Sequence, residues 1–466
     1  MFAEHLRSPV FAALARNTAS AFTRVRKLPL FQLVTFLINL PRSGLQAELF
    51  AYFDHALGLS PDHAISKSAL CQARRQLNPE SMRHLLQFSH QCIVQHVTAP
   101  SWHGFQIKAI DSSVLRLPST PECIEHFGGM HPHQGSFSPL CRASVLYDVA
   151  RGCCVDAVLG SYHQGDRELA LNHRAYLDST DLVVYDRGYP SREFFIMHLQ
   201  QSLKFCMRIS MGTWNQVKAF AQGSSNDTLV NLGTASEPLS LRLLRARLPN
   251  GQVYYFATNL LDPCLNAQDF ADLYRGRWRI EEAFKLIKAR MNLENWTGIL
   301  PYVVQQDFYA SLLHANFASM LAVAAAPYAM QPLGGAHICI QGWIVKLNQT
   351  LVIKILRHHL PKLLLGCAAD NLTSQLIQRL QNSSCLERQR EIRGSQPRRP
   401  PEFRSLAKIN LDFIDILFLT LPYKRVICSL AEGFLMFRAW NTLACSSVID
   451  DRPETGATWL SLMLCC

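Results

Sequence analysis

The amino-acid sequence predicts a mixed α/β fold in which a helical region precedes a sheet that carries acidic side chains. Three observations support this prediction. Helical patterns fill the first 100 residues, including the apolar run 31–40 that Pro41 ends. Residues 105–210 contain β-rich runs, at first consecutive and then separated by helical segments. The segment 274–288 has the spacing of an amphipathic helix.

The predicted sheet begins with three antiparallel strands and continues with two strands that alternate with helices. Hairpin turn residues, Arg151 and Gly152, separate the second and third strands. The predicted strands are 107–117, 142–149, 154–159, 182–185 and 203–209, and the predicted helices between the last three are 166–177 and 191–199. A second hairpin, 241–258, is expected before the helical segment 274–288.

Two aspartates lie at places where a strand would not need them. Asp111 lies within the first strand, where β propensity disfavours an acid, and Asp186 directly follows the apolar strand 182–185. Open α/β sheets bind ligands just beyond the carboxyl ends of their strands. The alternative for an aspartate at a strand end is a helix cap or a turn residue, which is the commoner use of one such residue.

One narrow stripe of the segment 274–288 combines an aromatic ring, two cations and a carboxylate. At about 100° per residue, with Tyr274 at zero, Arg277 falls near −60°, Glu281 near −20° and Lys288 near −40°. Trp278 and Lys285 lie within about 40° of this stripe, whereas Glu282 lies roughly 100° further around. The alternative is a solvated helix face with i,i+4 ion pairs.

Three carboxylates from these segments could together bind two divalent cations roughly 4 Å apart and promote in-line attack on a phosphodiester. The four stripe residues also match a known signature: Tyr274, two residues, Arg277, three residues, Glu281, six residues and Lys288. The chain therefore resembles the bacterial insertion-sequence transposases of the DDE class that carry the Y-R-E-K signature. The runs that begin at Asp111 and Asp186 resemble the other two acidic motifs of that family.

The resemblance implies a domain organisation. Residues 105–300 would form a ribonuclease H-like catalytic core with a β-rich insertion at about 211–261. A helical DNA-binding domain, 1–100, would precede it, and a helical region, 301–386, would follow it. The remaining residues would form a basic linker, 387–409, and an atypical tail, 410–466, where the resemblance ends.

The resemblance also implies the chemistry. The chain would be a transposase that binds the terminal inverted repeats of its element and catalyses strand cleavage and strand transfer. Asp111, Asp186 and Glu281 would hold two Mg²⁺ ions, for which Mn²⁺ could substitute. Tyr274, Arg277 and Lys288 would contact DNA phosphates, with Trp278 and Lys285 as further candidates. The alternatives are a nuclease of the same fold that does not join strands, and an inactive DNA-binding relic.

Charge and composition agree with a nucleic-acid partner. The 466 residues carry a formal net charge of +11, which favours a polyanion. The basic helix 66–77, with a serine cap, supplies candidate phosphate contacts, although it could equally be an exposed helix of a bundle. The predicted contacts outside the catalytic segment are Lys67, Arg74 and Arg75 in this helix and Arg242, Arg245 and Arg247 in the insertion. The expected partners are double-stranded DNA, as element end and as target, and a second copy of the chain in a synaptic homodimer.

The remaining features bear on the compartment. Fifteen cysteines include no Cys-x-x-Cys pair, which argues against a zinc site and indicates reduced thiols. No uncharged apolar run reaches the roughly 20 residues of a membrane span. We therefore expect a bacterial cytoplasmic, nucleoid-associated protein with no membrane partner.

Overall fold

The protein is described here from a computed structural model. It describes residues 1–388, apart from 25, 41, 43, 59–64, 132–135, 234–238, 249, 326–337, 341–342, 367–370 and 384. The predicted tail 410–466 and all of the predicted linker beyond residue 388 lie outside the described residues.

The N-terminal region is helical, as predicted. Polar side chains start several helices: Ser8, Ser66 and Asn78 each accept a hydrogen bond from a backbone N–H in the first turn, so the predicted serine cap at Ser66 is confirmed. The elements are α1 (Phe2–Arg7), α2 (Pro9–Leu14), α3 (Leu30–Asn39), α4 (Leu45–Ala51), η1 (Tyr52–Ala56), α5 (Lys67–Arg75) and α6 (Pro79–His96).

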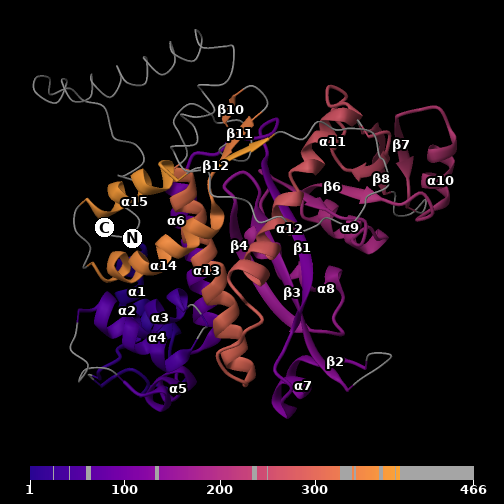
Figure 1. The fold of residues 1–466 in the computed structure, drawn as a ribbon. Coiled ribbons are helices and arrows are strands. Elements are labelled where there is room, and N and C mark those ends of the chain that lie inside the picture. The colour runs from indigo at the N-terminus through magenta and orange to yellow at the C-terminus, as the bar shows by residue number, and fades with distance from the viewer. Residues whose placement is uncertain are drawn as a thin grey trace, which may run out of the picture.

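A nine-stranded sheet forms the centre of the molecule (Figure 1). Its first strands are β1 (Gln106–Arg116), β2 (Gly129–Met130), β3 (Ser138–Asp148), β4 (Cys153–Ser161), β5 (Asp181–Tyr185) and β6 (Lys204–Ile209). β1 pairs with β3 and β3 with β4 in antiparallel fashion, whereas β1, β5 and β6 are mutually parallel neighbours. The predicted order of three antiparallel strands followed by two parallel ones is therefore confirmed.

Helices connect these strands and cover both faces of the sheet. They are α7 (Pro121–Phe127), α8 (Asp166–Leu171), η3 (Arg174–Tyr176) and α9 (Arg192–Gln200). Strand β5 is buried throughout because its side chains alternate between two hydrophobic clusters. Leu182 and Val184 join one cluster, and Val183 and Tyr185 join the other.

The segment between β6 and the next helices extends the same sheet. It contains α10 (Asn215–Gln222), β7 (Asp227–Asn231), β8 (Ser240–Arg247) and β9 (Val253–Thr258). β9 pairs antiparallel with β6 and with β8, and β7 completes the edge. The second predicted hairpin is thus present, and its strands continue the central sheet.

The segment 274–288 is not one regular helix, which corrects the prediction. It comprises the end of α11 (Ala267–Arg275), α12 (Trp278–Lys285) and part of the π-helix η4 (Leu286–Arg290). At the break, the N–H groups of Gly276 and Arg277 donate to carbonyls three residues earlier, as in a 3₁₀ turn. Both residues keep right-handed helical dihedrals, so the chain continues in a helical sense.

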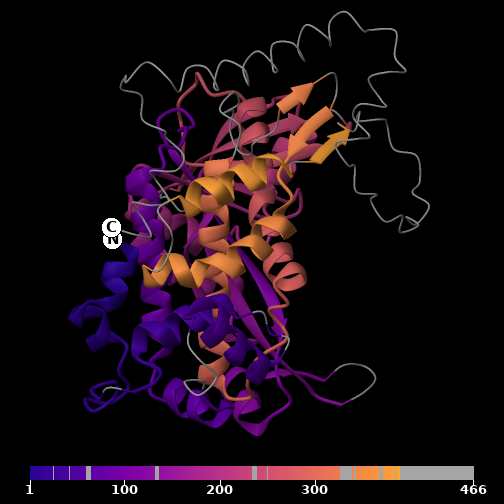
Figure 2. The same cartoon turned by 60° about the vertical axis from the view of Figure 1, so that its left-hand side comes forward.

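The C-terminal region is mostly helical but also contains a small sheet. Its elements are α13 (Pro301–Ala325), α14 (Gln349–Leu365), α15 (Leu372–Gln381) and the three-stranded sheet of β10 (Ile338–Ile340), β11 (Trp343–Lys346) and β12 (Cys385–Arg388). In Figure 2 the orange helices of this region lie in front of the purple strands, and the orange strands of the small sheet lie at the upper right.

Helix α13 joins the two halves of the structure. It contacts α3, α6, α14 and β4, and Figure 1 shows it between the indigo N-terminal helices and the sheet. Among the described residues it is the one helix long and apolar enough to cross a membrane, but 72% of its most apolar window is buried in the protein. One hydrophobic cluster runs from Phe2 through the sheet to Leu380, so the N-terminal helices share a core with the rest of the chain.

Candidate active site

Two neighbouring parallel strands bring the two predicted aspartates to the same level of the sheet. Ala109 on β1 is in register with Val184 on β5, and Asp111 and Asp186 each lie two residues further along. The backbone N–H of Ser112 donates to Asp111 Oδ1 at 2.9 Å. Parallel pairing therefore explains why residues 75 positions apart in the sequence lie side by side on neighbouring strands.

The third acid, Glu281 on α12, is linked to Asp111 by hydrogen bonds from Arg277. The guanidinium of Arg277 donates to Asp111 Oδ2 at 3.0 Å through Nη1 and to Glu281 Oε1 through Nη2. The side chain of Arg277 is only 4% exposed, whereas Asp111 is 21% and Glu281 31% exposed. Solvent can thus reach both carboxylates beside a buried cation.

Tyr274 attaches the same helical segment to the second aspartate. Its hydroxyl donates to Asp186 Oδ1 at 2.7 Å, and its ring lies 5.3 Å from the guanidinium carbon of Arg277. Tyr274, Arg277 and Glu281 therefore face β1 and β5 together, as the stripe predicted. A 3₁₀ turn preserves this alignment because residues three apart in such a turn lie one above the other.

Lys288 lies along the same strand, further from the acids. Its Nζ donates to the carbonyl of Val114, three residues beyond Asp111 on β1, at 2.5 Å. A second contact, 3.9 Å to Glu294, is long for an ion pair. Lys288 is 29% exposed, so this ammonium can still be reached by an anion that approaches along β1.

The pKa values of the two aspartates are shifted by burial and by the neighbouring charges. Burial raises the pKa of Asp111 to about 6; Arg277 opposes this shift, and the charges of Asp186 and Glu281 increase it. Burial alone would raise the pKa of Asp186 too, but the hydrogen bond from Tyr274 and the charge of Arg277 hold it below its usual value. The acids therefore lie within electrostatic reach of one another.

The donor set suits a hard divalent cation. Carboxylate oxygens are the ligands that Mg²⁺ and Ca²⁺ prefer, and mutual repulsion among the acids favours any added positive charge. Within the part of the chain that the structure describes, no three His, Cys, Asp or Glu side chains lie at metal-ligand spacing. The side chain of Arg277 donates hydrogen bonds to both Asp111 and Glu281.

Comparison with known proteins shows what the part of the chain that carries this arrangement is similar to. A family model described as a transposase DDE domain matches residues 102–317, which include all three acids and the four signature residues. These residues, just under half of the chain, are thus similar to a transposase DDE domain.

The chain is also similar to named bacterial proteins. It is 24% identical to the putative transposase InsZ of Escherichia coli K12 over 42% of this chain and 66% of that protein, so the chain spans just under two thirds of that relative. It is 23% identical to the transposase InsG for insertion sequence element IS4 of the same organism, over 67% of this chain and 74% of the relative. With a probable transposase for insertion sequence element IS5377 of Geobacillus stearothermophilus it shares 23% identity, over 44% of this chain and 54% of that protein.

The chain aligns with one solved structure, a piggyBac transposase synaptic complex with hairpin DNA. The alignment covers 81% of this chain and 80% of the chain in that structure. The TM-score is 0.40 and the sequence identity 11%, and no conclusion about this chain is drawn from this similarity.

Two of the weaker candidates in the catalytic segment are exposed to solvent. Lys285 pairs with Glu282 at 2.7 Å, and both side chains are more than 60% exposed. Trp278 is 51% exposed. The prediction that Glu282 faces away from the acids agrees with this geometry, and Lys285 and Trp278 stay candidates for contact with DNA.

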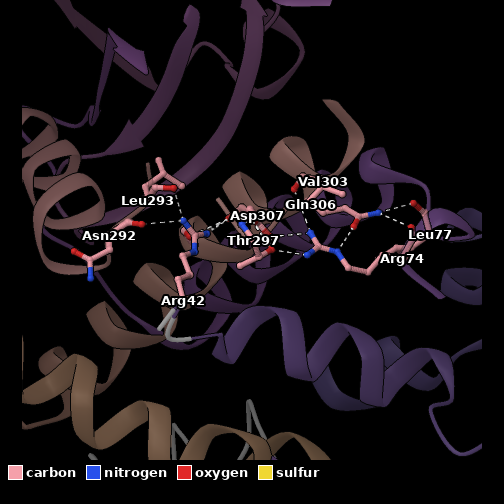
Figure 3. Close-up of polar contacts among 10 residues, drawn as sticks. Arg42, Arg74, Leu77, Asn292, Leu293, Thr297, Val303, Gln306 and Asp307 are labelled. Carbon is pink, nitrogen blue, oxygen red and sulfur yellow. Dashed lines mark hydrogen bonds and ion pairs between the residues drawn. The ribbon is translucent and has the colours of Figure 1, made fainter. Parts of the chain in front are cut away.

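Arg74 of α5 is a structural residue here, which corrects its prediction as a phosphate contact. Figure 3 shows its guanidinium among Asp307, Gln306, Thr297 and Val303, and it lies 2.8 Å from Asp307 Oδ1. Both members of this ion pair are at most 2% exposed. The pattern of basic residues could not show this, because Asp307 lies 233 residues away in the sequence.

A second arginine extends the same buried network, which we call the Asp307 network: Arg42, Arg74, Thr297, Gln306, Asp307 and Ser311. Arg42 donates to the carbonyls of Leu293 and Asp307, each at 2.6 Å (Figure 3). These contacts fix the segment 292–297, in which Trp296 donates to the carbonyl of Arg116 at the end of β1. The network thus connects the N-terminal helices to the strand that carries Asp111.

Of the three arginines predicted in β8, two have structural partners in the protein and one is exposed. Arg242 is buried and pairs with Asp227, and Arg245 donates to the carbonyls of Phe220, Ala221 and Gly223. Both therefore stabilise the fold of the insertion. Arg247, together with Lys67 and Arg75 of α5, is exposed and stays a candidate for DNA contact.

Sequence reasoning missed one cation beside the acids, Arg208 on β6. It follows Met207, the register partner of Tyr185, so it lies next to Asp186 across the sheet. Its guanidinium carbon lies 4.1 Å from the ring centre of Tyr254, whose ring packs edge-on against Tyr274. Its position near the carboxyl end of β6, the strand that neighbours β5, was the signal that could have identified it.

Proposed function

We propose that this chain is a transposase that binds the terminal inverted repeats of an insertion sequence and catalyses metal-dependent strand cleavage and strand transfer. One observation carries the proposal: Asp111, Asp186 and Glu281 come from three separate elements and meet around Arg277 and Tyr274. A solvated helix face would not bring a helical glutamate, through one buried arginine, to an aspartate on the central strand.

In this proposal the three acids hold two Mg²⁺ ions, and Mn²⁺ can take their place. When bound, such a pair of ions activates the attacking oxygen and stabilises the leaving oxygen of an in-line displacement. Tyr274 orients the carboxylate of Asp186 through its hydroxyl. Lys288 supplies a positive charge for a phosphate along β1, since its ammonium is partly exposed.

The finer fold assignment belongs to the same proposal. Five strands in the order β4, β3, β1, β5 and β6 have the antiparallel and parallel arrangement of a ribonuclease H-like core. The acids then lie on its first strand, after its fourth strand and on a later helix. Strands β7 to β9 would be the insertion that contacts the DNA ends, and two copies of the chain would hold two ends.

The proposed DNA surface differs from the sequence prediction. Lys67, Arg75 and Arg247 are exposed, and Arg208 lies half-buried beside Asp186 without an ion pair to any described residue. These four cations and Lys288 are the phosphate contacts that we propose. Tyr274 is 2% exposed, and its hydroxyl donates a hydrogen bond to Asp186. We therefore assign Tyr274 to the positioning of Asp186 and not to contact with DNA.

The test uses the purified full-length chain, Mg²⁺ and an oligonucleotide that carries an inverted repeat from the DNA flanking the gene. We expect cleavage at the repeat, with a free 3′-hydroxyl, and a joined product with target DNA. Cleavage without any joined product would identify a nuclease instead. Binding of the repeat without cleavage would identify an inactive DNA-binding relic.

A further inference from the structure

Arg277 occupies the space between two of the proposed metal ligands. Its Nη1 lies 3.0 Å from Asp111 Oδ2, and its Nη2 donates to Glu281 Oε1. The carboxylate oxygens that would bind a cation are therefore already neutralised by a side chain of the same protein. With 4% exposure, this guanidinium is one of the most deeply buried parts of the cluster.

The guanidinium is not fully satisfied in this position. Its Nε is buried, and none of the described residues accepts a hydrogen bond from it. A buried N–H without an acceptor is costly, and native proteins pair almost all such groups. Arg277 thus has two charge-assisted hydrogen bonds to the acids and a buried Nε–H that lacks an acceptor among the described residues.

We infer that Arg277 is an internal counter-ion that holds Asp111 and Glu281 together in the metal-free protein and competes with the divalent cation for their oxygens. This inference rests on the proposed function, since it assumes that the acids bind metal. A cation that binds Asp111 and Glu281 displaces the guanidinium from Oδ2 and Oε1. The displaced guanidinium, with all its donors free, is suited to a DNA phosphate, which it can bind as a two-pronged donor.

The consequence is a coupling between metal and DNA. Each Mn²⁺ ion that enters must break charge-assisted hydrogen bonds to Arg277, which weakens metal binding to the free protein. A phosphate that accepts the released guanidinium offsets this cost. Metal and DNA should then each strengthen the binding of the other.

The first experiment measures Mn²⁺ binding alone to the full-length protein by the loss of the free-ion signal in electron paramagnetic resonance. Removal of the competing guanidinium in R277Q should tighten Mn²⁺ binding about tenfold or more, because charge-assisted hydrogen bonds no longer have to be broken. The matched control is R279Q, which removes the same charge two residues further along. Arg279 donates to the carbonyl of Val149 and not to the acids, so R279Q should bind Mn²⁺ like the wild type.

A second measurement uses the wild type and does not depend on whether R277Q folds. In this experiment a dicarbonyl reagent modifies arginine side chains, and peptide mass spectrometry measures the rate at each residue. Saturating Mg²⁺ without DNA should increase the rate of modification of Arg277 and leave the rate at Arg279 unchanged.

The outcomes separate the inference from the proposed function. Equal or weaker Mn²⁺ binding by R277Q, or an Arg277 that stays protected in Mg²⁺, would overturn the counter-ion role, provided that D111N abolishes the wild-type Mn²⁺ site. If D111N leaves Mn²⁺ binding unchanged, the acids are not the metal site, and the proposed function fails together with the inference.

Discussion

The ion pair between Arg74 and Asp307 allows the correction of Arg74 to be tested quantitatively. We predict that Arg74→Met destabilises the protein and has no direct effect on contacts with DNA. The variant keeps the length and apolar stem of the side chain but removes four hydrogen bonds, including the one to Asp307 Oδ1. Asp307 then loses the buried positive charge that holds its pKa below the usual value despite burial.

The size of the effect follows from burial. Breaking a buried ion pair by removing one partner costs about 3–5 kcal/mol, because the other charge stays buried and has lost its direct partner. The unfolding entropy is about 2.1 cal/mol/K per residue, so a cooperative unit of roughly 400 residues should lose about 5 °C in midpoint temperature. Arg74→Met combined with Asp307→Asn should cost less than the sum of the single variants, because neither member of the pair then keeps a charge that has lost its partner.

The assay is thermal unfolding together with the salt dependence of binding to end DNA. Arg75→Met is the matched control, since Arg75 is the exposed neighbour in α5; it should keep the wild-type midpoint. If Arg75 contacts a phosphate, the slope of the logarithm of the DNA-binding constant against the logarithm of the salt concentration should be smaller by about one unit in Arg75→Met. An Arg74→Met variant with an unchanged midpoint and a reduced salt slope would refute the reasoning and restore Arg74 as a DNA contact.

Three further predictions follow from the site and its surroundings. Replacing Mg²⁺ by Ca²⁺ should permit binding of end DNA but block cleavage, because Ca²⁺ takes more ligands in looser geometry; efficient strand transfer in Ca²⁺ alone would contradict the two-metal proposal. Arg208→Gln should weaken DNA binding and lower the salt slope by about one unit at an unchanged midpoint temperature, and a fall in that midpoint with wild-type DNA affinity would make Arg208 a purely structural residue. Burial lowers the pKa of His198 to about 4, so the unfolded chain takes up the proton first and about 3 kcal/mol of stability is lost as pH falls from 6.5 to 4. His198→Gln should remove this part of the acid sensitivity in denaturant titrations; an unchanged pH dependence would mean that His198 titrates normally.

Local patterns predicted much of the fold because the determining interactions are close in sequence. The apolar strand 182–185 is buried on both faces because its side chains alternate between two clusters. The cap at Ser66 depends on residues three apart, and the stripe of Tyr274, Arg277 and Glu281 on residues three and four apart. A spacing of three residues fits both an α-helix and a 3₁₀ turn, so the pattern could not predict the break at Gly276.

The roles of individual arginines depend on distant partners and could not be predicted. Arg74 and Arg75 are adjacent and chemically identical, yet one is buried against Asp307 and the other is exposed. Arg242 meets Asp227 through the pairing of β7 with β8, which fixes its place in the insertion. Charge patterns indicate that a surface is basic, but only the tertiary structure shows which cations already have an acid.

The most direct test of the central claim compares cleavage of end DNA in Mg²⁺ by the variants D111N, D186N and E281Q with cleavage by E282Q. Glu282 is the matched control because it lies next to Glu281, carries the same side chain and pairs outward with Lys285. We predict that the first three variants fold and bind DNA but do not cleave it, whereas E282Q cleaves at close to the wild-type rate. Mg²⁺-dependent cleavage by a folded variant of any of the three acids would remove that residue from the active site, and loss of cleavage in E282Q alone would contradict the proposed arrangement of the acids.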